Sequence, residues 1–468
     1  MTVSTPFPDQ RLPDQRFNWT PQPQAAAIVA ELTAAIEQDL QSARRLRERM
    51  QAETGTRLDD WIDHLVLPPD DQLGVALTEA GFSVDESGED QVWRHTSGIF
   101  PAIRFAPRGV RRIVVRVDSV VTFFVANEIC DRELIDAPPL APIRRGKVAV
   151  EGNAELWVIE RHGTQALTPL PMDANLLLKV VDYSEAFRLR KRLAGSVAEA
   201  FEILKTMIRR SARDLGRART CDLFFKAERD YWQNRNRAAR IQKARQDRIG
   251  LGWGNHDHHT YRSSREHFAT LIAILETLGF ECRERFYAGK EAGWGAQVLE
   301  HGPCGITVFA DVDLSPEEVS GDFAHQPLPQ RQELGTVGLW CALHGEAILE
   351  AGMHHLECQF DFNASRSQLQ TEGVNTMKPF TDLPFLRQAF VQGEIWPVRS
   401  ERIDALLASG RITAEQGDRF RTEGALGSHL EILQRNEGFK GFNQTGINDI
   451  ILKTDPRRQG EYTARGSE

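Results

Sequence analysis

A cluster of histidines at residues 255–262 carries the side chains in this sequence that are best suited to chemistry. The segment reads Asn-His-Asp-His-His-Thr-Tyr-Arg. Thr260 and Tyr261 favour an extended backbone, in which alternate residues share one face. His258 and Arg262 are therefore predicted to point the same way as Thr260. Neutral imidazole is a ready metal ligand, and a guanidinium binds a carboxylate through two parallel hydrogen bonds. The segment predicts a metal ligand beside an anion-binding group, and a histidine-rich turn at a strand start is the structural alternative.

Bulk properties exclude several other classes of protein. A chain of 468 residues is too long for one ordinary core, so two or three domains are expected. The net charge of −9 argues against a general nucleic-acid binder. No apolar run is long enough to span a bilayer, and the N-terminus lacks the pattern of a secretory signal. The six cysteines are scattered without a C-x-x-C pair, which indicates reduced thiols in a cytoplasmic protein.

Four regions are expected along the chain to position the histidine cluster. Residues 1–55 are predicted to form an arm and a helix, 56–182 an α+β region, 183–249 a basic helical connector and 250–468 the metal-binding domain. Within the α+β region, residues 120–125 are predicted to be one of several strands. The many cations at 209–248 are interpreted as a solvated helical face, with an anion funnel as the alternative.

The C-terminal region shows the order strand, helix and three strands. An amphipathic helix at 265–278 is expected to end at Gly279, and strands are expected at 281–287, 295–300 and 305–312. A second round is predicted to begin near residue 353. Its first strand is 354–362 and a later strand is 394–398, followed by a helical tail over 401–434.

This βαβββ order, met twice with a histidine on each opening strand, resembles the vicinal oxygen chelate superfamily. Within it, the sequence is most similar to the 2-oxoadipate dioxygenase/decarboxylase (hydroxyglutarate synthase) family. The similarity covers roughly residues 250–460. The matching motifs are His258 with Arg262 four residues later, His354-His355-Leu356-Glu357, Gly393-Glu394-Ile395, and the strand and turn at 309–315.

The resemblance implies a half-barrel of two modules around one metal. A histidine would come from the first strand of each module and a glutamate from the last strand of the second, and His258, His355 and Glu394 are taken as these ligands. Because both histidine motifs contain doublets, His259 and His354 remain alternatives. Glu160, in a similar segment of the N-terminal half, is an alternative to Glu394. Two histidines and one carboxylate form the facial triad of non-haem Fe(II) oxygenases.

The predicted function is therefore that of an Fe(II)-dependent dioxygenase that decarboxylates a 2-oxo acid or a similar carboxylate-bearing small molecule with O2. Arg262 is expected to act in catalysis by binding the substrate carboxylate, and Tyr261 is expected to donate to the substrate. The alternatives are a metal-dependent isomerase, lyase or ring-cleaving enzyme of the same fold, and a non-enzymatic ligand-binding protein whose histidines are structural. Family analogy implies a possible homodimer. The net charge and the lack of a long apolar run argue against nucleic acid and membrane as partners.

Overall fold

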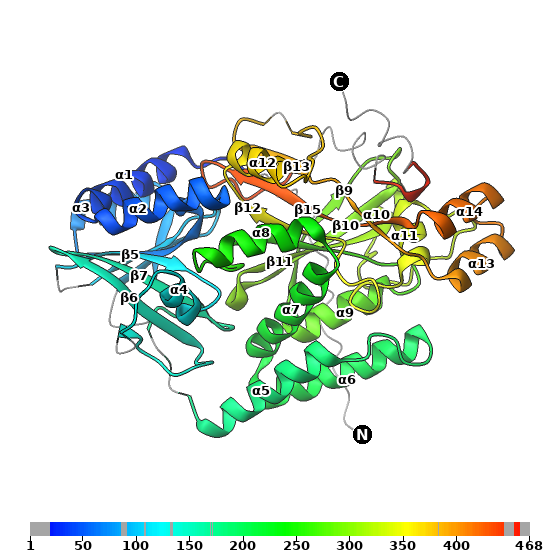
Figure 1. Cartoon of the computed structure of the whole chain (residues 1–468), viewed down its shortest axis with the longest axis horizontal. Helices are drawn as coiled ribbons and strands as arrows, with labels where there is room; N and C mark the ends of the chain where they lie inside the picture. The colour runs from blue at the N-terminus through cyan, green and yellow to red at the C-terminus, as the bar shows by residue number, and fades with distance from the viewer. Residues whose placement is uncertain are drawn as a thin grey trace, which may run out of the picture.

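The protein folds as two mixed β-sheets that lie side by side, each covered by helices of its own (Figure 1). The computed structural model describes residues 19–85, 91–106, 109–131, 134–168, 170, 172–381, 383–443 and 454–458. Among these residues, no helix has both the length and the apolar character needed to cross a membrane.

The N-terminal sheet has seven strands in the order β2-β3-β4-β1-β5-β7-β6. Its core includes apolar side chains from helices α1 and α2, so these helices pack on the sheet (Figure 1). The strands are β1 (Ile62–Leu67), β2 (Phe82–Asp85), β3 (Gln91–His95), β4 (Ala102–Phe105), β5 (Arg111–Arg116), β6 (Ile143–Glu151) and β7 (Ala154–Arg161); the helices are α1 (Pro23–Asp39), α2 (Gln41–Arg49), α3 (Asp71–Glu79) and α4 (Val120–Ala126).

The C-terminal sheet follows the order β13-β15-β12-β8-β11-β10-β9, and β14 pairs with β15 beside this path. The strands are β8 (His256–Arg262), β9 (Glu281–Tyr287), β10 (Trp294–His301), β11 (Ile306–Asp313), β12 (His355–Gln359), β13 (Leu386–Phe390), β14 (Glu394–Trp396) and β15 (Ala425–Arg435). The helices are α9 (Phe268–Leu278), α10 (Pro316–Val319), α11 (Thr336–His344), α12 (Phe362–Thr371), α13 (Ser400–Ala408) and α14 (Ala414–Thr422). The predicted helix and three strands of the first round are confirmed, and Gly279 ends α9 with φ at +106°.

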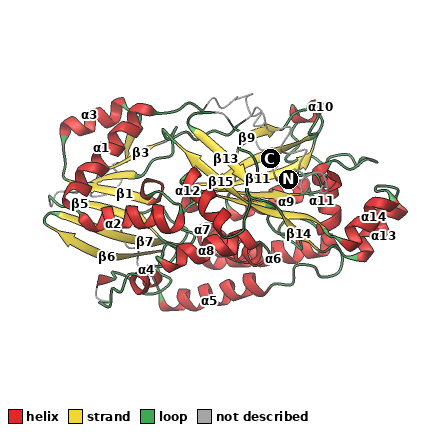
Figure 2. Ribbon diagram, turned by 45° about the horizontal axis from the view of Figure 1, so that its top comes forward, coloured by secondary structure: helices red, strands yellow, loops and turns green. Residues whose placement is uncertain are grey.

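Four helices connect the sheets: α5 (Ala174–Leu189), α6 (Val197–Leu215), α7 (Arg217–Asn234) and α8 (Arg237–Arg248). They lie on one side of the C-terminal sheet (Figure 2) and share its largest core cluster, to which Phe224, Tyr261 and Leu356 belong. The single helical connector expected over 183–249 is therefore broken. Gly216, at φ +82°, separates α6 from α7, and Asn236 caps the start of α8.

The two sheets repeat one topology. In the C-terminal sheet, β8 is parallel to β11, β12 is parallel to β15, and β8 is antiparallel to β12. In the N-terminal sheet, β1 is parallel to β4, β5 is parallel to β7, and β1 is antiparallel to β5. Each sheet is thus a pair of β-α-β modules whose first strands meet at the centre. This order confirms the predicted paired modules in the C-terminal half and extends them to the N-terminal half.

Two further secondary-structure predictions were wrong. Residues 120–125 form helix α4, because Ser119 caps it and Phe123 and Phe124 pack into the N-terminal core. The tail predicted as helix over 401–434 forms α13 and α14 and then strand β15. A central strand with both faces buried lacks the alternation that identifies strands in a sequence.

Candidate metal centre

One cavity of about 80 Å³ collects side chains from all seven strands of the C-terminal path, so the sheet curves around it. His258, Thr260 and Arg262 of β8 line this cavity together, as the alternation of a strand predicts. The opposite face of the sheet packs against the connecting helices through apolar residues. The concave face therefore carries the polar side chains that line this cavity.

A bulge at Asp257 sets the position of His258. The pairing of β8 with β12 shifts register just before His258, which leaves Asp257 without a cross-strand partner. His258 Nδ1 lies 2.9 Å from an oxygen of Asp257. Arg435 donates two hydrogen bonds, of 2.6 and 2.9 Å, to the same carboxylate. Because Nδ1 is held by Asp257, Nε2 is the atom of His258 that remains for a metal.

Two carboxylates and two further histidines lie beside His258 on neighbouring strands. Glu357 on β12 is paired with His258, and Glu431 on β15 is paired with Glu357. His355 is paired in the same way with His429. His355 Nε2 lies 3.6 Å from Glu357 Oε1 and 3.7 Å from Glu431 Oε2. Ligand atoms of His258, His355 and Glu357 all lie within 4.8 Å of one another.

Burial keeps the imidazoles of this cluster neutral. It lowers the pKa of His258 to about 4, although Asp257 opposes the shift, and lowers the pKa of His429 to about 3. Burial also lowers the pKa of His355 well below its usual value. The carboxyl group of Glu431 responds in the opposite sense, and burial raises its pKa well above 4.5. Neutral histidines are the form that binds metals, and a carboxylate in such a place needs a cation.

The arrangement of acceptors fits a divalent metal. Glu357 Oε2 contacts His258 Nε2, yet both atoms are acceptors once His258 Nδ1 carries the proton. Glu357 Oε2 has no hydrogen-bond donor within the described part of the chain. Glu357 and Glu431 are 2% and 1% exposed, and buried carboxylates are costly without a neutralising cation. A metal ion between these acceptors would supply the missing positive charge.

Arg262 carries a buried and largely unpaired guanidinium on the same face. Its Nε and Nη1 have no hydrogen-bond partner among the described residues, and Nε lies 4.0 Å from Asp311 Oδ2. Burial raises the pKa of Asp311 to about 8, so this carboxyl group is protonated near neutral pH. The guanidinium is therefore available to a carboxylate that enters the cavity.

The members of each histidine doublet lie in different surroundings, and His354 and His355 together with His429 form a second group of neighbouring ligand atoms. The ring of His259 lies in an edge-to-face contact with Phe225 of α7, on the helical side of the sheet. His354 lines the cavity, but its Nδ1 lies 3.1 Å from the carbonyl of Gly427. His258 and His355 are the two whose ring nitrogens meet the carboxylates.

Three other residues predicted for the site lie elsewhere. Tyr261 points into the helical core, where its hydroxyl donates to Glu228 at 3.4 Å, because it is out of phase with His258 along the strand. Glu394 accepts a hydrogen bond of 3.0 Å from the backbone of Arg237 and does not join the histidine cluster. Glu160 belongs to β7 of the other sheet, where it accepts a hydrogen bond from the backbone of Val120.

The carboxylates that do meet the histidines were missed, although the sequence contains a signal for them. His355-Leu356-Glu357 and His429-Leu430-Glu431 repeat the same three residues. In a strand, the first and third residues of each repeat share a face. The repeat at His429-Leu430-Glu431 was overlooked because residues 401–434 were predicted to be helical.

The N-terminal sheet repeats the framework of this site without its ligands. Asp63 occupies the equivalent bulge of β1, contacts His64 at 2.6 Å and binds Arg161 through two hydrogen bonds. By register, Arg112, Val114 and Trp157 stand where the C-terminal sheet has His355, Glu357 and Glu431. The acid–histidine–arginine arrangement thus belongs to the shared architecture, whereas the described residues of the N-terminal sheet hold no comparable group of histidines and glutamates.

Comparison with known proteins found similarity at the level of solved structures. No family model and no curated protein matches the chain. A mutant of 4-hydroxymandelate synthase from Streptomyces coelicolor is 12% identical, with 85% of this chain and 98% of that chain covered and a TM-score of 0.28. A xylose isomerase-like TIM barrel/4-hydroxyphenylpyruvate dioxygenase fusion protein is 13% identical, with coverages of 97% and 61% and a TM-score of 0.22. Protein YdcJ from Shigella flexneri, which includes domain DUF1338, is 12% identical, with coverages of 55% and 73% and a TM-score of 0.24.

The fold class rests on the strand order itself. Four β-α-β modules form two paired sheets, and the C-terminal pair has the arrangement of the vicinal oxygen chelate fold. Its cavity carries the buried cluster of histidines and glutamates.

Proposed function

We propose that the protein is an Fe(II)-dependent oxygenase that acts on a small carboxylate-bearing substrate, most specifically a 2-oxo acid that loses CO2. The observation that carries this proposal is the convergence of His258 Nε2, His355 Nε2 and two buried carboxylates in one cavity. Two histidines and a carboxylate suit Fe(II) and leave coordination positions for substrate and O2. The bound iron would supply the redox chemistry, and the protein residues would position the reactants.

His258 and His355 are assigned as ligands, and Glu431 as the third. The resemblance found in the sequence places the glutamate on the last strand of the second module, and that strand is β15. Gln388 donates to Glu431 Oε1 at 2.9 Å, which orients the carboxylate and leaves Oε2 directed toward His355. Glu357 adds a second negative charge beside the ion. Together the two carboxylates balance the charge of a divalent cation.

Arg262 is assigned to the substrate carboxylate. It shares the concave face with His258, the residue is 2% exposed, and its guanidinium has no carboxylate hydrogen bond among the described residues. A protonated Asp311 leaves that charge unpaired. A substrate bound to Arg262 would place its remaining groups toward the ligand cluster, where the apolar rings of Phe309 and Phe390 limit the access of water.

Metal content of protein purified without oxygen tests the ligand assignment. We expect about one iron per chain in the wild type and its loss in His258→Ala, His355→Ala and Glu431→Gln. Glu394→Gln is the matched control, because it removes a charge from a neighbouring strand outside the cluster. Loss of iron in Glu394→Gln, or full retention in Glu431→Gln, would contradict the assignment.

Oxygen uptake with a panel of 2-oxo acids tests the reaction. Consumption of O2 with release of CO2 is expected from the iron-loaded wild type. An isomerase or lyase of the same fold would convert its substrate without consuming O2. A ligand-binding protein would bind the acid and leave it unchanged, with binding unaffected by His258→Ala.

A further inference from the structure

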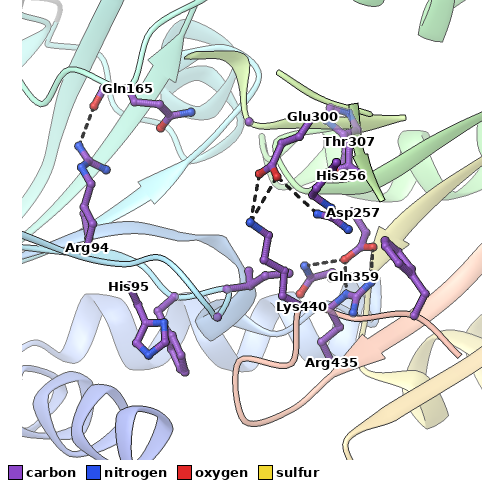
Figure 3. A pocket seen from close by; sticks show the side chains of 17 residues that line it. Arg94, His95, Gln165, His256, Asp257, Glu300, Thr307, Gln359, Arg435 and Lys440 are labelled. Carbon is purple, nitrogen blue, oxygen red and sulfur yellow. Dashed lines mark hydrogen bonds and ion pairs between the residues drawn. The ribbon is translucent and has the colours of Figure 1, made fainter. Parts of the chain in front are cut away.

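A second cavity, of about 340 Å³, lies between the two sheets and is larger than the one at the ligand cluster. Figure 3 shows Arg94 and Gln165 on one side of it and Lys440, Glu300 and Asp257 on the other. Arg94 belongs to β3 of the N-terminal sheet, whereas Asp257 belongs to β8. A cavity of this size at a junction between domains is a common place for a small ligand.

Positive charge dominates the walls of this cavity. Arg94, Arg283, Arg435 and Lys440 line it, against the carboxylates of Asp257 and Glu300. Low-dielectric walls that carry one excess sign of charge concentrate ions of the opposite sign.

Arg94 is the cation that stands without a carboxylate. Its Nη2 donates at 3.1 Å to the carbonyl of Gln165, and no carboxylate pairs with it in the part of the chain that the structure describes. Arg283 pairs with Glu284 at 2.5 Å, and Lys440 lies 3.3 Å from Glu300. The guanidinium of Arg94 can therefore face an anion without breaking an existing ion pair.

Two residues that line this cavity, Arg435 and Asp257, connect it to His258 through hydrogen bonds. Arg435 binds Asp257 through two hydrogen bonds, and Asp257 holds His258 Nδ1. Phe442 lines both cavities, and its ring lies 5.1 Å from that of His258. A ligand that draws Arg435 toward itself would loosen the Arg435–Asp257 pair and strengthen the pull of Asp257 on His258.

We propose that this cavity is a binding site for a small anion bearing carboxylate or phosphate groups, that Arg94 is its principal partner, and that its occupancy raises the metal affinity of His258 through Arg435 and Asp257. The site is distinct from the ligand cluster, and its anion binding does not depend on the proposed oxygenase reaction. The coupling to His258 rests on the proposed role of that residue as a ligand.

Calorimetric titration of the full-length protein tests anion binding. Inorganic phosphate and tricarballylate serve as separate probes at constant ionic strength, so that phosphate and carboxylate ligands are distinguished. Both wild type and Arg94→Gln are titrated. Arg111→Gln, which removes an equal charge from β5 away from the cavity, is the control.

We expect saturable binding of at least one probe by the wild type, at least tenfold weaker binding by Arg94→Gln, and unchanged binding by Arg111→Gln. Absence of saturable binding by either probe would overturn the site. Equal affinities of wild type and Arg94→Gln would overturn it as well, because they would show that the anion binds elsewhere.

The coupling is tested by the affinity for Co(II), with free Co(II) fixed by a metal buffer so that complexes of the probe with the ion do not interfere. The bound anion should raise the Co(II) affinity by several-fold, and by linkage Co(II) should raise the anion affinity by the same factor. Unchanged Co(II) affinity at saturating anion would overturn the coupling and leave the anion site standing. Failure of Co(II) to bind at all would contradict the metal centre and not the anion site.

Discussion

Replacement of Glu431 by glutamine should have opposite effects on stability with and without metal. Glu431 and Glu357 are directly paired across two strands and almost fully buried. Neighbouring strands lie about 5 Å apart, and this spacing sets the distance between two such side chains. Two unit charges at that distance repel by about 3 kcal/mol at an effective dielectric constant of about 20. Because a proton can relieve part of this repulsion, we expect Glu431→Gln to stabilise the metal-free protein by about 1–3 kcal/mol.

Bound metal should reverse the relative stability of the wild type and Glu431→Gln. An ion at about a thousand times its dissociation constant stabilises the folded state by about 4 kcal/mol. The wild type should gain this amount, and Glu431→Gln should gain much less because it lacks a ligand. With saturating metal the wild type should therefore be the more stable protein.

Urea unfolding at neutral pH, with and without Co(II) under anaerobic conditions, measures both differences. Glu394→Gln is the control and should change stability little in either state, since its carboxylate is partly exposed and bound to a single backbone N–H. If Glu431→Gln destabilises the metal-free protein, contacts within the protein already stabilise the Glu431 carboxylate without a cation. That result would refute the argument that the paired acids require a cation.

Four further predictions concern neighbouring side chains. Arg262→Gln should weaken binding of a 2-oxo acid by about 2–3 kcal/mol, the contribution of hydrogen bonds to a charged group, as measured by calorimetry on the metal-loaded protein. Affinity for the acid should fall as pH rises through about 8, because ionised Asp311 competes for Arg262, and Asp311→Asn should remove this dependence. The pKa of Asp311 in the folded protein lies above its usual value of 3.8. This group should therefore lower the free energy of unfolding as pH rises from about 4 to about 8, by at most about 1.4 kcal/mol per pH unit. Asp311→Asn should flatten this dependence of the free energy of unfolding on pH. Asp257→Asn should lower metal affinity about 10- to 100-fold, and a Co(II) titration that shows no change would contradict its role in holding His258.

Local patterns predicted the first module well. The alternation along 256–262 identified the shared face of His258 and Arg262, and the amphipathic helix α9 ended at Gly279 as expected. Strands β9, β10 and β11 followed close to their predicted bounds. These elements are contiguous in sequence and their faces differ in polarity, so periodicity alone defines them.

The second module was harder to predict because its closing strand is separated from its opening strand by two helices. Residues 425–435 are buried on both faces, so no alternation of polar and apolar residues marks them. Glu394 was predicted to be the third ligand from a short motif, but its carboxylate accepts a hydrogen bond from the backbone of Arg237. The proposal that Glu431 is a ligand depended on recognising that strand.

The sequence by itself determined which residues of β8 share a face, the order of the first module and the presence of histidines suited to a metal. Tertiary structure decided which acids meet them. The parallel pairing of β12 with β15 brings Glu357 beside Glu431 and His355 beside His429, although these residues lie far apart in the chain. Such register depends on the packing of the whole sheet between helices and cavity, and short-range sequence patterns do not encode it.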